Sequence, residues 1–391
     1  MKFRSFFWTV IVGAIATFVF SLAGLAWLVS QSSVNLLWGG VNRFPTGTVF
    51  VAKQAPAVVS LLVNPEKLYG LRQVSLPLSD RNRERLEWQQ WEDYLTAKIG
   101  FKYQKHFKPW LGEEITLAVA SLDSDRNPEN GAQPGYILVV QTRNQKLAQE
   151  SLRSFYSQQN DVTIDRYKGA NIIVSPASSS VWSSVFLGDF ILFANQPQIL
   201  KEAINQAQAI KLNINQSEYY RAALGNIQQP HIGIGYIDLP GFSAWLNKSP
   251  KFSPAKGDQA LAVSLSIRGS NLAAQTILPS GTEALDNFLL DNPELQTLLA
   301  ALPFSDRASD NDSIVENLKH TLASNKLSSN SVYIKIKGAK SWIEDKDKIP
   351  LYQLSKLALQ SLFPHLKAIA VQKLETKDET DRANILFELD S

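Results

Sequence analysis

The chain has 391 residues, of which 45% are hydrophobic and 19% are charged. This is the composition of a folded protein, which excludes a disordered or low-complexity chain. Cysteine is absent, so disulfides, thiolate zinc sites and cysteine nucleophiles are excluded. The formal net charge is +3, but no run of basic residues gathers as it does in nucleic-acid binders, so we expect no nucleic-acid partner.

The first predicted element is an apolar segment, Phe6–Val29, that carries no charge. As a helix rising about 1.5 Å per residue it would measure about 36 Å, enough to cross a hydrocarbon core of about 30 Å. Trp8 and Trp27 lie near its ends, where such rings favour the membrane interface. Lys2 and Arg4 precede it, which places the N-terminus in the cytoplasm and the rest of the chain on the far side.

Two further properties of this segment bear on its role. Small-x-small sequences at Ser21 and Gly24 would also suit a cleaved signal peptide, but an apolar signal region runs only about 7–15 residues, and the greater length here favours an uncleaved anchor. Gly13, Thr17, Ser21 and Gly24 fall on one helix face, where a second transmembrane helix could approach, although such spacings are also common by chance. The predicted anchor residues are Phe6, Trp8, Gly13, Thr17, Ser21, Gly24 and Trp27.

The remainder predicts an α+β fold. After a cytoplasmic tip and transmembrane helix (1–30) and a juxtamembrane linker (31–47), we expect two similar subdomains, 48–225 and 226–391, each an antiparallel sheet backed by helices. Predicted strands are Val49–Ala52, Val58–Val63, Ile115–Leu122, Tyr136–Gln141, Thr163–Tyr167, Asn171–Val174, Val181–Leu187, Phe190–Ala194, Ile232–Ile237, Leu261–Arg268, Leu272–Leu278, Val332–Lys337, Leu366–Leu374 and Asn384–Leu389. Predicted helices are Arg81–Ile99, one capped by Asn144 and running through Tyr156, one starting at Pro197, Pro240–Leu246, Ala284–Leu290, Pro293–Leu302, Ile314–Ala323 and Tyr352–Leu362.

Internal similarities favour a duplication. Tyr136-Ile137-Leu138 and Phe190-Ile191-Leu192 each lead into a helix, and Ser60–Leu68 is similar to Gly235–Trp245, where a strand is followed by Asn or Asp and then by a proline. Gly188-Asp189 predicts a two-residue hairpin turn.

The stretches Phe44–Leu68 and Leu187–Ile204 carry a resemblance to a known family. The layout is similar to that of an uncharacterised cyanobacterial family, a DUF3352-like domain of unknown function behind an N-terminal membrane anchor. The resemblance implies a cell-envelope or thylakoid location. It implies no activity and no catalytic residues.

A polar loop is the one candidate metal site. Asp123, Asp125, Asn127 and Glu129 alternate like the oxygen ligands of a calcium loop. The glycine and glutamate that an EF-hand requires are replaced by Pro128 and Pro134, so an ordinary loop between two strands is the alternative.

An aromatic cluster is the candidate partner surface. Trp88, Trp91 and Trp110 lie near Phe101 and Phe107 in the sequence and could face a protein partner or lipid headgroups, since such rings prefer half-wet sites. The alternative is that the cluster packs in the core, because aromatic side chains bury much apolar area.

Catalytic motifs give little support for an enzyme. No two of the four histidines have the i, i+4 spacing of a zinc helix, and the Ser253–Lys256 match to penicillin-binding enzymes contains Pro254 and lacks the motif that should follow it. We therefore predict a non-enzymatic, membrane-tethered binding or scaffold protein without a cofactor. It would be a single-pass protein, with its main domain periplasmic or thylakoid-lumenal, that meets the lipid bilayer through residues 6–29 and binds membrane proteins or complexes. A carrier of a lipid or other apolar ligand, and a hydrolase with a spatially assembled site, are the alternatives.

Overall fold

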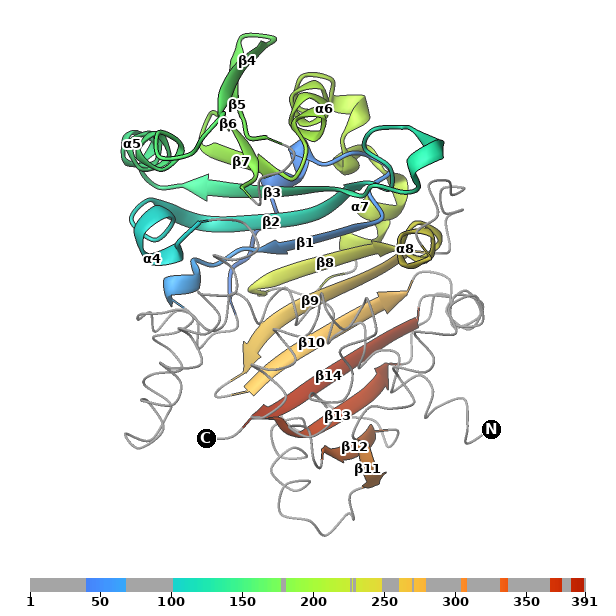
Figure 1. The fold of residues 1–391 in the computed structure, drawn as a ribbon. Helices are drawn as coiled ribbons and strands as arrows, with labels where there is room; N and C mark the ends of the chain where they lie inside the picture. Colours follow the sequence, from blue (N-terminus) through green and yellow to red (C-terminus); the bar gives the residue numbers. More distant parts are fainter. Residues whose placement is uncertain are drawn as a thin grey trace.

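A computed structural model describes residues 40–67, 101–176, 181–225, 227, 230–247, 260–268, 271–278, 304–307, 331–336, 366–374 and 381–389. Its strands form one 14-stranded antiparallel sheet, in the order β11-β12-β13-β14-β10-β9-β8-β1-β2-β3-β7-β6-β5-β4 (Figure 1). The fold is α+β, as predicted, but strands from both predicted subdomains join in a single sheet, because β1 pairs with β8 at its centre.

The strands agree closely with the sequence pattern. Their bounds are β1 Ala57–Leu61, β2 Leu111–Ser121, β3 Gly135–Thr142, β4 Thr163–Tyr167, β5 Ala170–Val174, β6 Ser183–Leu187, β7 Phe190–Ala194, β8 Gly233–Asp238, β9 Ala260–Arg268, β10 Asn271–Leu278, β11 Phe304–Arg307, β12 Ser331–Ile336, β13 Leu366–Leu374 and β14 Asp381–Leu389. The helices are η2 Gly47–Phe50, α4 Tyr103–His106, η3 Pro128–Asn130, α5 Gln145–Tyr156, α6 Pro197–Gln208, η4 Ile210–Leu212, η5 Ile214–Gln216, α7 Glu218–Gly225 and α8 Leu239–Leu246.

The strand order is the same in the two halves of the sheet. Reading outward from the central β1–β8 pair, one half runs β1-β2-β3-β7-β6-β5-β4 and the other β8-β9-β10-β14-β13-β12-β11, so each strand has a counterpart seven strands later. The counterpart pairs β3–β7 and β10–β14 are both antiparallel. The halves are therefore topological copies, whereas the boundary at residue 225 stays a prediction.

Of the two internal similarities noted in the sequence, one relates strands that occupy equivalent places in the two halves of the sheet. Ser60–Leu68 and Gly235–Trp245 include the ends of β1 and β8, the two counterparts at the centre of the sheet. The other joins β3 to β7, which are neighbours within one half.

Local chemistry accounts for the turns and helix starts. Asn144 caps α5 by accepting a hydrogen bond from the amide of Leu147, and Pro197 opens α6, where its missing N–H costs nothing. Gly188 takes a φ of 59° in the turn between β6 and β7, as the two-residue hairpin requires.

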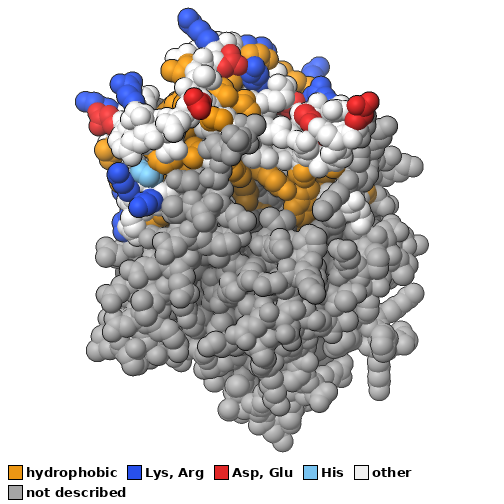
Figure 2. All heavy atoms as spheres, viewed as in Figure 1, with side chains coloured by type: hydrophobic (Ala, Val, Ile, Leu, Met, Phe, Trp, Pro, Cys, Tyr) orange, Lys and Arg blue, Asp and Glu red, His pale blue; other side chains and the backbone are white. Residues whose placement is uncertain are grey.

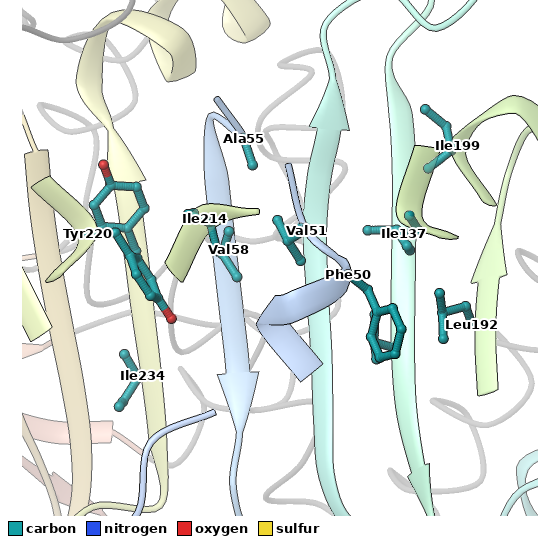
Figure 3. Close-up of a cluster of buried hydrophobic side chains, with 14 of the residues drawn as sticks. Phe50, Val51, Ala55, Val58, Ile137, Leu192, Ile199, Ile214, Tyr220 and Ile234 are labelled. Carbon is teal, nitrogen blue, oxygen red and sulfur yellow. The ribbon is translucent and has the colours of Figure 1, made fainter. Parts of the chain in front are cut away.

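Two cores cover the faces of the first half. The strap-face core packs α6, α7, η2 and η5 on one face, and the α5-face core packs α4 and α5 on the other. In Figure 3, Phe50 and Val51 lie over the sheet beside Ile214, Ile137 and Leu192.

One predicted strand is wrong. Val49–Ala52 does not enter the sheet, because Gly47–Phe50 curls into the 3-10 helix η2 and packs across the strands. The predicted helices at 81–99, 284–290, 293–302, 314–323 and 352–362 lie outside the described residues. Within those residues no helix is long and apolar enough to cross a membrane, and the predicted anchor at 6–29 lies outside them.

Candidate functional site

The segment that follows the N-terminal region crosses one face of the sheet and is here named the strap, residues 40–56. Backbone bonds fix it at both ends. Val41 forms a β-bridge with His231, and the amide of Lys53 donates to the carbonyl of Leu212 over 2.8 Å. The amide of Asp238 in turn donates to Pro56 over 2.9 Å. The strap is thus attached to elements 159 to 190 residues away in the sequence.

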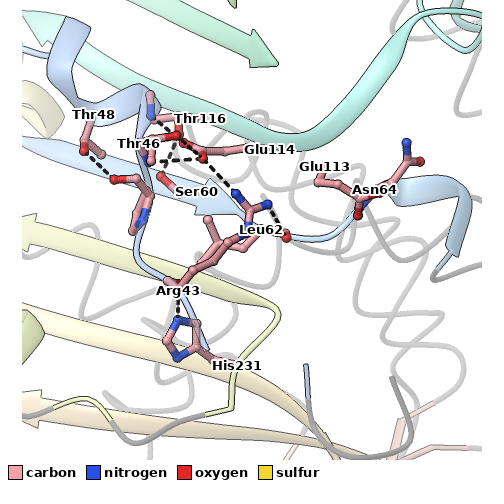
Figure 4. A network of polar contacts seen from close by, with 12 residues as sticks. Arg43, Thr46, Thr48, Ser60, Leu62, Asn64, Glu113, Glu114, Thr116 and His231 are labelled. Carbon is pink, nitrogen blue, oxygen red and sulfur yellow. Dashed lines mark hydrogen bonds and ion pairs between the residues drawn. The ribbon is translucent and has the colours of Figure 1, made fainter. Parts of the chain in front are cut away.

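A buried glutamate of β2 holds the middle of the strap. The carboxylate of Glu114 is fully buried and accepts three hydrogen bonds, from the Thr46 amide at 3.1 Å, the Thr46 hydroxyl at 2.7 Å and the Gly47 amide at 2.5 Å (Figure 4). Those two amides lie at the start of η2, where helix geometry leaves N–H groups without partners and favours a negative charge. The carboxylate therefore determines where the strap turns.

Arg43 balances the buried charge. Its guanidinium lies 3.5 Å from the Glu114 carboxylate and donates to the carbonyl of Leu62 over 2.9 Å. A buried carboxylate without such a partner would be strongly destabilising. The Arg43 carbonyl lies 3.0 Å from Nε2 of the buried His231, which ties the network to the second half of the sheet.

Two glycines allow the strap to lie this close. A Cβ on Gly47 would be only 3.0 Å from both Glu114 and Val139. Gly40 has a φ of 131°, and a Cβ there would lie 2.3 Å from the backbone of His231. A side chain at Gly40 would therefore collide with the His231 backbone, and one at Gly47 would force Glu114 and Val139 to shift by a few tenths of an ångström.

Polar groups beneath the strap are also paired within the chain. The Thr48 hydroxyl lies 3.1 Å from the Pro45 carbonyl and 2.8 Å from the Asn215 side chain. Burial raises the pKa of the Tyr220 phenol; its hydrogen bond with Thr48 lowers that pKa, and the charge of Glu114 raises it. Tyr220 is therefore a neutral hydrogen-bonding group at physiological pH and does not act as a base.

The neighbouring Glu113 serves the opposite face of β2. It accepts from the Asn64 amide at 3.2 Å and pairs with Lys67 at 2.7 Å, and its side chain is 42% exposed. The side-chain NH₂ group of Asn64 donates to the carbonyls of Leu111 and Gly112. Adjacent glutamates thus fix the strap on one face and the end of β1 on the other.

Together these contacts form a clamp that holds the strap against the sheet of the same chain. Its donors and acceptors are engaged with strap, sheet and turn, which suits mechanical attachment. Among the residues that the structure covers, no three His, Asp or Glu side chains gather to hold a metal ion.

The candidate calcium residues lie in the loop between β2 and β3. Their oxygens bind the loop itself. Asp125 accepts from the amide of Asn127 and the side chain of Asn130, and Asn127 accepts from the amide of Glu129. Asp123 accepts from the amide of Gln133 at 3.3 Å. These bonds explain the alternating pattern as turn capping, and calcium binding stays a prediction.

The prediction of a partner surface at Trp110 is wrong. Trp110 is completely buried in the α5-face core, its ring lies 5.3 Å from that of Phe107, and its indole N–H donates to the carbonyl of His106. The alternative of core packing holds, because this face of the sheet must be covered and large rings cover it best. Trp88, Trp91 and all the anchor residues lie outside the described residues.

The two described histidines contact the backbone. His106 accepts the amide of Lys102 on Nδ1 at 3.0 Å, and His231 contacts Arg43. Burial, with smaller contributions from Lys105 and Lys102, lowers the pKa of His106. Both side chains have structural roles in this part of the chain.

Sequence reasoning did not single out Glu114 or Arg43. A signal was present in β2, where Glu114 and Thr116 occupy alternate positions of one face and both are buried. Two polar residues on a buried face need partners. The partner of Thr116 is Ser60, at 2.7 Å, and the partners of Glu114 are in the strap.

The fold and clamp define the class: an α+β protein built on one large antiparallel sheet, with an N-terminal segment fixed across it. The chain belongs to the family described as "Protein of unknown function (DUF3352)", which matches residues 10–321. No curated protein matches the sequence. Two crystal forms of TP0453 are similar in structure at 9% identity: form I covers 68% of this chain and 90% of that chain with a TM-score of 0.34, and form III covers 61% and 80% with a TM-score of 0.31.

Proposed function

We propose that this protein is a membrane-tethered, non-enzymatic binding or scaffold protein, with residues 6–29 as the tether and the sheet domain on the periplasmic or lumenal side. The observation that supports this is the clamp on the strap, the first described segment after the predicted anchor. Glu114 and Arg43 fix the strap to the sheet at its middle, so the sheet begins close to the membrane segment in the chain.

The connection between anchor and clamp is short. Residues 30–39 separate them, and a chain of that length reaches at most about 35 Å when fully extended. A domain held within that distance meets membrane partners at a high effective concentration without needing new contacts. Because the strap is fixed to the sheet, the connection is only these ten residues long, which would also limit the directions in which the sheet faces its partners.

The test is cellular and uses the full chain. Fractionation should place the intact protein in the membrane, and protease added outside the cytoplasmic compartment should digest the sheet domain. Proximity labelling from the C-terminus should then recover the same membrane proteins repeatedly. Recovery of intact protein in the soluble cytosol, or digestion only from the cytoplasmic side, would refute the proposal.

A matched pair of variants tests the clamp. Glu114→Gln should leave the protein in the membrane but change the set of labelled partners, since the sheet would no longer be held at the strap. Glu113→Gln, one residue away on the opposite face, should leave that set as it is.

A further inference from the structure

Two large aliphatic side chains protrude from one short turn of the described domain. Ile210 is 65% exposed and Leu212 is 51% exposed, and both belong to η4, directly after α6. We name this turn, with the adjoining strap residues Lys53 and Gln54, the Ile210 tip. Two neighbouring apolar side chains of this exposure would favour an apolar partner or phase.

The tip is held rigidly by the strap. The Leu212 amide donates to Ala209 over 2.8 Å, which closes the turn, and the Leu212 carbonyl accepts from Lys53 over 2.8 Å. The next residue, Asn213, is buried, and the Ile214 amide donates to Val51 over 3.0 Å. The aliphatic side chains are therefore presented on a fixed backbone.

The charged residues of the two segments that build the tip have one sign. Lys53 and Lys211 are exposed beside the aliphatic pair. The strap and residues 203–217, the two segments that build the tip, contain no Asp or Glu. On the face drawn in Figure 2, hydrophobic side chains are exposed between scattered Lys, Arg, Asp and Glu side chains.

Ile164 provides the contrast. It is the most exposed of the described large hydrophobic side chains, at 72%, but it precedes Asp165 on β4 and follows Asp161 in the sequence. Exposure alone is thus not the distinguishing property. Apolar exposure combined with cations, without carboxylates in the segments that carry it, distinguishes the Ile210 tip.

We propose that the Ile210 tip is a second membrane contact, at which Ile210 and Leu212 enter the interfacial region of an anionic bilayer. Lysines beside inserted aliphatic side chains are attracted to anionic headgroups, and their stems can lie along the apolar surface. The contact rests on the proposed tether, because a weak two-residue insertion needs the domain to be held at the membrane already.

The absence of cysteine makes the test direct. Full-length Gln208→Cys, labelled with an environment-sensitive fluorophore, would be reconstituted into vesicles of phosphatidylglycerol and phosphatidylcholine that carry nitroxide-labelled lipids. The label at the end of α6 should be quenched. A label at Thr163→Cys, beside the equally exposed Ile164, should not be quenched.

Substitutions at the tip then test its chemistry. Ile210→Ser with Leu212→Ser, added to Gln208→Cys, should lower the equilibrium constant for contact at least about tenfold, as expected for the exposure of two aliphatic side chains to water. Vesicles of phosphatidylcholine alone, or Lys53→Gln with Lys211→Gln, should also reduce quenching, since the attraction to headgroups is lost.

Flotation of the same vesicles separates the two proposals. Protein that floats but shows equal quenching at positions 208 and 163, or unchanged quenching in the serine variant, would overturn the tip contact alone. Tip residues that crosslink to a protein partner and remain unquenched would also overturn it. Protein that does not float would overturn the tether itself.

Discussion

The two faces of the first half of the sheet are covered in different ways. On the strap face, a chain segment is placed by a buried carboxylate and an arginine, and aliphatic side chains fill the space around them. On the α5 face, rings pack against rings, with Phe101 and Phe155 stacked at 4.1 Å and Phe101 edge-on to Phe193 at 5.2 Å.

The two kinds of packing differ in how strictly they determine the position of the chain segment that covers the sheet. Aromatic packing removes much apolar area from water and leaves no buried charge to be satisfied. A buried carboxylate with three donors accepts only the arrangement that satisfies it. We infer that both faces contribute stability by burying apolar side chains, whereas the strap face also determines where the chain from the N-terminal region joins the sheet.

The largest expected effect is on the α5 face. Trp110→Ala should destabilise the protein by about 3–5 kcal/mol, because it leaves a large cavity and removes the hydrogen bond from the indole N–H to the His106 carbonyl. Chemical denaturation of full-length protein in mild detergent measures this. Trp110→Phe should lose less, and a loss below about 1 kcal/mol for the alanine variant would contradict the assignment of this core.

The next effect concerns the clamp. Glu114→Gln replaces one carboxylate oxygen by an NH₂ group, which would face either the Gly47 amide or the Thr46 amide and Arg43, all of which need an acceptor. It should cost about 2–3 kcal/mol. Glu113→Gln, half-exposed on the other face, should cost less than about 1 kcal/mol. Equal losses from the two variants would mean that the strap is not fixed by Glu114. Limited proteolysis at the strap is a second readout.

A smaller effect distinguishes the helices that cover the two faces. Asn144→Ala should cost about 1 kcal/mol, because the side chain of Asn144 caps α5. Gln196→Ala, at the corresponding position of α6, should change the unfolding free energy little, since Gln196 makes no capping bond. Similar losses at the two positions, measured by denaturation, would count against capping as the cause.

The smallest effect depends on pH. Nδ1 of His106 accepts a backbone hydrogen bond, and burial lowers its pKa below the ordinary 6.5, so the unfolded chain takes up the proton first as pH falls. Neutral His106 therefore contributes fully to the free energy of unfolding above about pH 6.5, and this contribution is lost as pH falls below that value. Between pH 8 and pH 5, the melting temperature should fall less for His106→Phe than for the unchanged chain. Parallel curves would refute this role.

Local pattern was sufficient to place most of the elements. The residue types in short segments such as Thr163–Tyr167 and Phe190–Ala194 predicted strands with the observed bounds, and the turn at Gly188 and the cap at Asn144 act within a few residues. Backbone preferences and short-range hydrogen bonds decide such features, so they can be read directly from the chain.

Tertiary structure alone decided the remaining features. Val49–Ala52 has the composition of a strand, but Glu114, more than sixty residues away, binds the start of η2 and curls it. The sequence alone allowed Trp110 to lie either on the surface or in the core. In the structure it is buried in the core that covers the α5 face of the sheet. The joining of both halves in one sheet depends on the β1–β8 pair, whose strands are separated by most of the first half. Contacts between distant residues determine these outcomes, and no local pattern records which distant groups will meet.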